Sequence, residues 1–234
     1  MLPVLGTLLL GGIAALDAAP VGQTLLSQPL VTAALLGWVW SDWDVALKVG
    51  VVLQILAAST LPLGARTPED YAAGGVVGVG LALALASQQP FAFARDACAL
   101  VGVFCGMIAA TAGVPLIKWQ RRHNEGLSRW CEAELRRGAE SALGESHRAA
   151  VVLAFAIGVS FCAVCLGLGI TGLGGVVSHE SLRLSRAWSL AQPLWLGLGL
   201  AQLLNAFVHR RLGRAALFGI ALVVAWLVLM VGAS

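Results

Sequence analysis

The sequence predicts an all-α, polytopic integral membrane protein, and three features of the chain indicate this class. Of the 234 residues, 59% are hydrophobic and only 12% are charged, whereas soluble domains carry roughly 25% charged residues. Uncharged stretches long enough to cross about 30 Å of hydrocarbon, which takes roughly 20 helical residues, recur along the chain. The sequence lacks the roughly ten-residue alternating segments of an outer-membrane barrel, so the predicted elements are helices.

We expect about seven to eight hydrophobic segments. The first lies within residues 1–20, and we expect it to be retained, because it lacks a basic start and carries Asp17 where a cleavage motif would lie. Two less regular segments follow, and a third begins after residue 70. The clearest spans come later, at residues 97–117, 149–177, 187–208 and 215–234.

Basic residues divide the chain into a membrane region at 1–117, an amphipathic loop at 118–148 and a second membrane region at 149–234. The loop holds seven of the fifteen Lys and Arg residues, so the positive-inside rule places it in the cytoplasm. A second basic cluster at 209–214 falls on the same side, which leaves Ser234 outside. The N-terminal orientation stays open, because the first 47 residues contain no Lys or Arg.

The amphipathic loop at 118–148 has two interpretations. Leu127, Trp130, Cys131 and Leu135 follow helical spacing, with charged residues on the remaining face. Such a segment lies on anionic lipid headgroups or docks a soluble partner, and the sequence favours neither. The basic residues form no continuous stripe, so we expect no nucleic-acid partner.

The N-terminal third departs from the pattern of simple spans. Residues 21–40 and 45–63 are apolar overall but carry polar side chains that a lipid-facing helix would not, namely Gln23, Thr24, Ser27, Gln28, Lys48 and Gln54. Polar groups at membrane depth need partners or water. Helices interrupted by proline and glycine, with polar groups on one side, indicate re-entrant or broken helices that line a binding site. The alternative is a set of ordinary polar loops.

The stretch LPLGARTPEDYAAGG, residues 61–75, is predicted to be the turn of such a hairpin. Its prolines and Gly64 prevent a continuous helix. Glu69 and Asp70 directly precede the next apolar run, so either can cap its N-terminus.

Small residues indicate where helices approach closely. GGVVG at 74–78 and GVFCG at 102–106 have the spacing of tightly packed transmembrane helices. We expect GLGITG at 167–172 and the cysteines also to serve packing, with no metal or nucleotide site.

The order of motifs over residues 5–150 resembles the membrane subunit IIC of the mannose/fructose/sorbose family of the bacterial sugar phosphotransferase system (PTS). Members have an N-terminal Asp, a G-Q element, an H-R-P-L-V or S-R-P-L-V element, a G-x-x-x-E-L helix and a G-A-x-x-P-P-D turn. The matching stretches here are LGTLLLGGIAALDAAPVGQTLLSQPLV, GVVLQIL, LPLGARTPEDYAAGGVV and, in the loop, RRHNEGLSRWCEAELRRG.

This resemblance implies a permease of the bacterial inner membrane that is not catalytic by itself and needs no cofactor. It implies pairing with a membrane subunit IID, trimers of IIC–IID pairs, and phosphate donation to the incoming hexose by a cytoplasmic IIB or IIAB protein. Binding of the sugar is expected from broken hairpins in residues 1–117. The expected substrate-binding residues are Asp17, Gln23, Ser27, Gln28, Gln54, Thr67, Glu69 and Asp70, because amides and carboxylates suit sugar hydroxyls.

Several positions depart from the family pattern. Ser27-Gln28-Pro29 stands where the family has H-R-P, Gln54 replaces the acidic residue of E-L, and Glu69 replaces a proline. Two alternatives therefore stay open besides a hexose permease: a transporter for another polyol, and a non-transporting membrane interaction or regulatory protein. An ion-coupled transporter, for which Asp17 is the candidate titrating residue, is a third class.

Overall fold

The structure is a computed structural model, and it describes residues 2–18, 21–22, 24–58, 69–89 and 94–207, with 213, 215–216, 218–220 and 223. The predicted last span at 215–234 lies largely outside these residues, as does the basic cluster at 209–214 apart from Gly213. Within the described residues the chain is helical, without strands. The helices are α1 (Leu2–Ala18), α2 (Pro29–Trp40), α3 (Trp43–Ala58), α4 (Tyr71–Ala86), α5 (Ala94–Arg136) and α6 (Ala142–Phe207).

Helix length separates α1–α4 from α5 and α6. The first four contain 17, 12, 16 and 16 residues, which is short of the roughly 20 needed to cross the hydrocarbon. Among the described helices, α5 and α6 are the two that are long and apolar enough to cross a membrane. The described residues thus confirm the predicted all-α class, and the four short helices lie in the N-terminal third.

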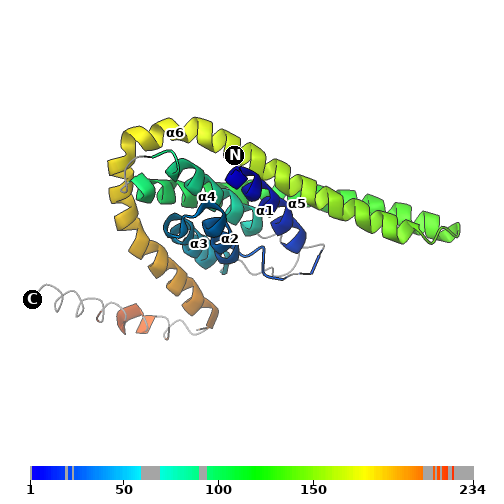
Figure 1. The fold of residues 1–234 in the computed structure, drawn as a ribbon. Coiled ribbons are helices and arrows are strands. Elements are labelled where there is room, and N and C mark those ends of the chain that lie inside the picture. The colour runs from blue at the N-terminus through cyan, green and yellow to red at the C-terminus, as the bar shows by residue number, and fades with distance from the viewer. Residues whose placement is uncertain are drawn as a thin grey trace, which may run out of the picture.

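Helix α4 lies at the centre of the helices that surround it (Figure 1). Every residue from Gly74 to Ala86 is buried, as expected for a helix that is apolar on all sides. Its glycines face those of α5: a Cβ on Gly78 would lie 2.7 Å from the carbonyl oxygen of Gly102, and one on Gly74 would lie 2.6 Å from that of Gly106. The predicted close packing through GGVVG and GVFCG is therefore confirmed.

Helix α6 extends along one side of the bundle and then bends around it (Figure 1). The sequence predicts separate spans at 149–177 and 187–208. Within α6, two helical stretches meet at a kink at Glu180, whose backbone is non-helical (φ −108°, ψ 19°), so a break does lie between the two predicted spans, without a separate loop. Earlier in α6, a Cβ on Gly158 would lie 2.5 Å from the carbonyl oxygen of Gly11, so α1 packs closely against this helix.

The predicted amphipathic loop at 118–148 is a helical hairpin. It consists of the end of α5, a turn containing Gly138 at φ +87°, and the start of α6. The hairpin projects away from the other helices (Figure 1). Of the predicted apolar stripe, Cys131 is buried, whereas Trp130 and Leu135 are exposed.

Ion pairs join the start of α3 to the start of α5. Lys48 Nζ lies 2.8 Å from both Asp44 Oδ2 and Asp96 Oδ1, and Arg95 pairs with Asp42, which precedes α3. The cavity described below lies at the other end of α3 and near the middle of α5, so the ion pairs are well separated from it along both helices.

Candidate functional site

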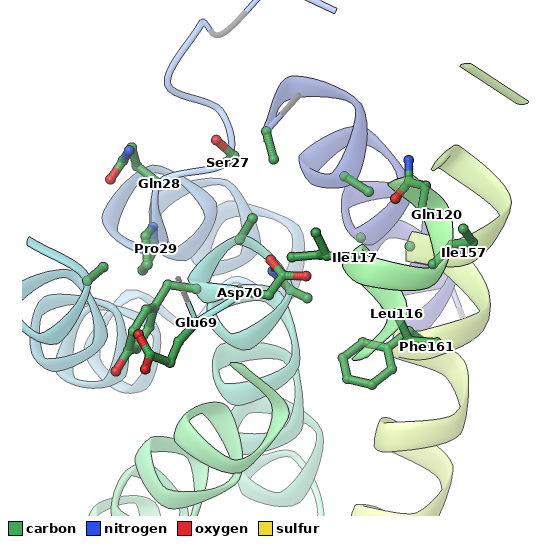
Figure 2. A pocket seen from close by; sticks show the side chains of 18 of the residues that line it. Ser27, Gln28, Pro29, Glu69, Asp70, Leu116, Ile117, Gln120, Ile157 and Phe161 are labelled. Carbon is green, nitrogen blue, oxygen red and sulfur yellow. The ribbon is translucent and has the colours of Figure 1, made fainter. Parts of the chain in front are cut away.

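A cavity of about 380 Å³ lies where the ends of several helices meet. Its walls come from the end of α1, the residues that lead into α2, the start of α4, the middle of α5 and α6. Figure 2 shows Asp70 among the labelled side chains, with Gln28, Pro29 and Glu69 on one side and Ile117, Gln120 and Phe161 on the other. The cavity therefore places carboxylates and amides beside an apolar surface.

Asp70 is held in place by α4 and α5. Its carboxylate accepts the Ala73 N–H at 3.1 Å, which makes it the N-cap of α4 as predicted. Its own N–H donates to the carbonyl oxygen of Ala110 at 2.9 Å. A Cβ on Gly113 would lie 2.7 Å from Asp70 Cβ, so the glycine leaves the space that the aspartate occupies. Its carboxylate is directed toward Ile117 (Figure 2).

Asp17 organises the polar loop that precedes α2. Although it belongs to α1 and is only 4% exposed, its carboxylate accepts hydrogen bonds from the Thr24 hydroxyl at 2.6 Å and from the Ser27 N–H at 2.8 Å. The Thr24 N–H donates to it as well. Leu25 in the same loop has φ +73°, a conformation that non-glycine residues rarely adopt. Asp17 thus fixes the conformation of the loop that places Ser27 and Gln28 on the cavity wall.

Gln54 positions Gln28 from a neighbouring helix. The Gln54 amide nitrogen donates to Gln28 Oε1 at 2.9 Å, and its oxygen accepts the Leu30 N–H at 3.1 Å. The second contact pairs a backbone donor at the start of α2 that has no intrahelical partner. Gln54 therefore links α3 to the start of α2.

The expected substrate-binding residues fall into three groups. Four of them line the cavity: Ser27, Gln28, Glu69 and Asp70. Asp17 and Gln54 are not on its wall and instead hold residues that are. Gln23 and Thr67 lie outside the described residues, as does most of the turn that begins at Leu61.

The sequence alone did not indicate the wall contributed by α5 and α6. Gln120, Arg121 and Asn124 line the cavity, although they lie in the segment that the sequence assigns to a cytoplasmic amphipathic loop. The available signal was the run of polar residues directly after the apolar span that ends at residue 117. From α6, Phe161 adds an aromatic surface. Within the described part of the chain, no group of His, Cys, Asp and Glu is arranged to hold a metal ion.

Within the described residues, fold and cavity together define an all-helical protein with long apolar helices and a cavity in which a few polar side chains lie beside an apolar wall. The sequence profile of the family described as "PTS system sorbose-specific iic component" matches residues 2–234. The chain therefore belongs to this family, and the resemblance stated from the motifs is confirmed over nearly its whole length.

Solved structures share the fold. One, described as "Structure of membrane protein", superposes with a TM-score of 0.66 at 17% identity, covering 97% of this chain and 95% of the other. A second, described as the mannose transporter ManYZ in complex with microcin E492 (MceA), gives a TM-score of 0.57 at 17% identity, covering 97% and 94%. Comparison with curated proteins finds no sequence match.

Proposed function

We propose that this chain is the sugar permease subunit of a mannose-type phosphotransferase system in the bacterial inner membrane. It carries a hexose or related sugar inward, and a cytoplasmic IIB or IIAB protein phosphorylates the sugar. Family membership and the fold shared with a structure described as a mannose transporter support the proposal.

The observation that carries the proposal is the chemistry of the cavity. Its volume of about 380 Å³ falls within the roughly 300–1,000 Å³ typical of small-molecule sites. Sugar hydroxyls both donate and accept hydrogen bonds, so they suit the carboxylates of Glu69 and Asp70 and the amide of Gln28. The apolar side chains of Ile117 and Phe161 offer a surface for the C–H groups of a sugar ring.

A membrane partner is part of the proposal. Many large apolar side chains are exposed on the isolated chain, among them Leu190 at 73% and Leu194 at 72%, and these contact lipid or another subunit. We propose that a IID subunit covers part of this surface and that IIC–IID pairs form trimers, as the family resemblance implies.

The proposal is tested by replacing Asp70 with Asn in the chain co-expressed with its IID subunit. Asn caps a helix about as well as Asp, so D70N retains the start of α4 and removes the negative charge. We expect at least a tenfold loss of hexose affinity, about 1.4 kcal/mol, with unchanged yield and IID pairing. E69Q should have a smaller effect. Binding is measured by isothermal titration with D-mannose, D-fructose, L-sorbose and D-glucose.

Two results would contradict the proposal. Parental affinity in D70N would remove Asp70 from the binding site. Failure of the parent pair to bind any of the four hexoses would instead favour a transporter for another polyol or a non-transporting membrane protein that acts through its projecting hairpin.

A further inference from the structure

A residue of the cavity wall on α5 carries a buried amide oxygen that has no hydrogen-bond partner in the part of the chain that the structure describes. Among the described residues, Asn124 Oδ1 and Trp195 Nε1 are the buried side-chain polar atoms without a hydrogen-bond partner. Of these two residues, Asn124 lines the cavity and Trp195 does not. Leaving a buried acceptor unpaired costs about 1–3 kcal/mol. A ligand donor that reaches this oxygen from the cavity would pair it and recover that free energy.

Asn124 belongs to a face of α5 whose side chains change from apolar to polar along the cavity wall. Residues three and four apart share a helix face, and the residues of α5 on the cavity wall are Leu116, Ile117, Gln120, Arg121 and Asn124. The first two are apolar and the last three are polar. A ligand held here therefore contacts an apolar surface at one level and amides one to two helical turns further along.

The polar part of α5 complements the start of α4. Glu69 and Asp70 supply acceptors from one element, and Gln120 lies across the cavity from Glu69 (Figure 2). A pyranose carries hydroxyls around its ring edge, so it needs hydrogen-bonding groups on more than one side. The amide groups of α5 are placed to serve the hydroxyls that α4 does not reach.

We infer that Asn124 is a specificity-determining residue of the sugar site, and that Oδ1 accepts a hydrogen bond from one hydroxyl of the bound hexose while Gln120 contacts a neighbouring hydroxyl. This inference rests on the proposed function. A site built around an amide discriminates strongly against a ligand that lacks the matching hydroxyl, because the amide is then left unpaired. Asn124 thus distinguishes hexoses by the hydroxyl group at one ring carbon.

The test uses the full chain co-purified with its IID subunit. The tightest-binding of the four hexoses named above is compared with its monodeoxy analogues, for the parent and for Asn124→Leu. We expect the parent to bind one analogue at least tenfold more weakly than the parent sugar. N124L should bind the sugar roughly tenfold more weakly than the parent does, and should bind that analogue and the sugar equally. Arg122→Ala, an exposed neighbour off the cavity wall, is the matched control and should keep the parental pattern.

A stability measurement separates a ligand contact from a structural role. Because Asn124 Oδ1 is unpaired without ligand, N124L should melt at the same temperature as the ligand-free parent or higher. A lower melting temperature would indicate that Asn124 supports the fold instead, and would overturn the inference.

The binding outcomes distinguish the inference from the proposed function. If the parent binds a hexose and N124L binds it equally well, or still discriminates against the same analogue, Asn124 is not a sugar ligand although the permease proposal stands. If the parent binds none of the hexoses, both fail.

Discussion

Replacing Gly113 with Ala tests how tightly the candidate site is built. The added Cβ would lie 2.7 Å from Asp70 Cβ and 2.9 Å from Asp70 Oδ2, where ordinary contacts begin at 3.4 Å. Either α5 moves away from the start of α4 or Asp70 leaves its position. Gly126→Ala, in the same helix, is the matched control, because no described atom lies within 4 Å of the Cβ it would gain.

The expected difference in the free energy of unfolding is the balance between a gain in helix propensity and the cost of the close contact. Gly→Ala in a helix interior contributes about 1 kcal/mol of stability, and both variants gain it. Only G113A incurs overpacking, about 1–3 kcal/mol, and weakens the Asp70 cap, about 1 kcal/mol. We therefore expect G113A to be less stable than G126A by roughly 2–4 kcal/mol, with G126A at or above the parent. Hexose affinity should fall in G113A alone, because Asp70 is displaced.

Both properties are measured on the co-purified IIC–IID pair. Stability is compared as the temperature at which half of the detergent-solubilised complex is lost from the size-exclusion peak, and affinity is measured by titration. Equal stability of G113A and G126A would show that the contact between α4 and α5 adapts without strain. Parental affinity in a destabilised G113A would separate Asp70 from binding.

Three further predictions concern packing, loop structure and topology. Gly78→Leu should prevent stable folding, since its side chain would meet the α5 backbone, whereas Gly175→Leu, which has open space around its Cβ, should give near-parental yield by fluorescence-detected size exclusion. Asp17→Ala removes the acceptor for Thr24 and Ser27 and should lower stability by about 1–3 kcal/mol, seen as faster proteolysis of the loop before α2; unchanged proteolysis would show that the loop holds its shape unaided. A reporter fused after Arg137 should be cytoplasmic and one fused at Ser234 external, and finding both on one side would refute the span count.

The features that sequence predicted well depend on local chemistry. The cap at Asp70 follows from an acidic residue directly before an apolar run, and the contact between α4 and α5 follows from glycines at helical spacing. Short helices in the N-terminal third were indicated by polar residues and prolines within apolar stretches. Each signal lies within one segment, so no knowledge of neighbouring segments was needed.

The remaining features depend on how distant segments meet. The sequence places Gln120 and Asn124 in a cytoplasmic amphipathic loop, because polarity alone does not distinguish a side chain at the membrane surface from one on a cavity wall. Asp17 was expected to bind substrate, yet its carboxylate pairs with the loop at Thr24 and Ser27. The break expected between residues 177 and 187 is present as a kink at Glu180 rather than as an open loop, a distinction that a charged stretch alone does not make.

The glycine contact between α4 and α5 also bears on how the cavity changes shape. Backbone meets backbone there, with no layer of side chains that can rotate to accommodate sliding. Asp70 at the start of α4 and the part of α5 up to Gly113 are therefore held in a nearly fixed relation, whereas Asn124 lies beyond Pro115, which removes a backbone hydrogen bond inside α5. A change in access to the cavity then comes from its other walls: the part of α5 beyond Pro115, the loop that Asp17 holds, and helix α6.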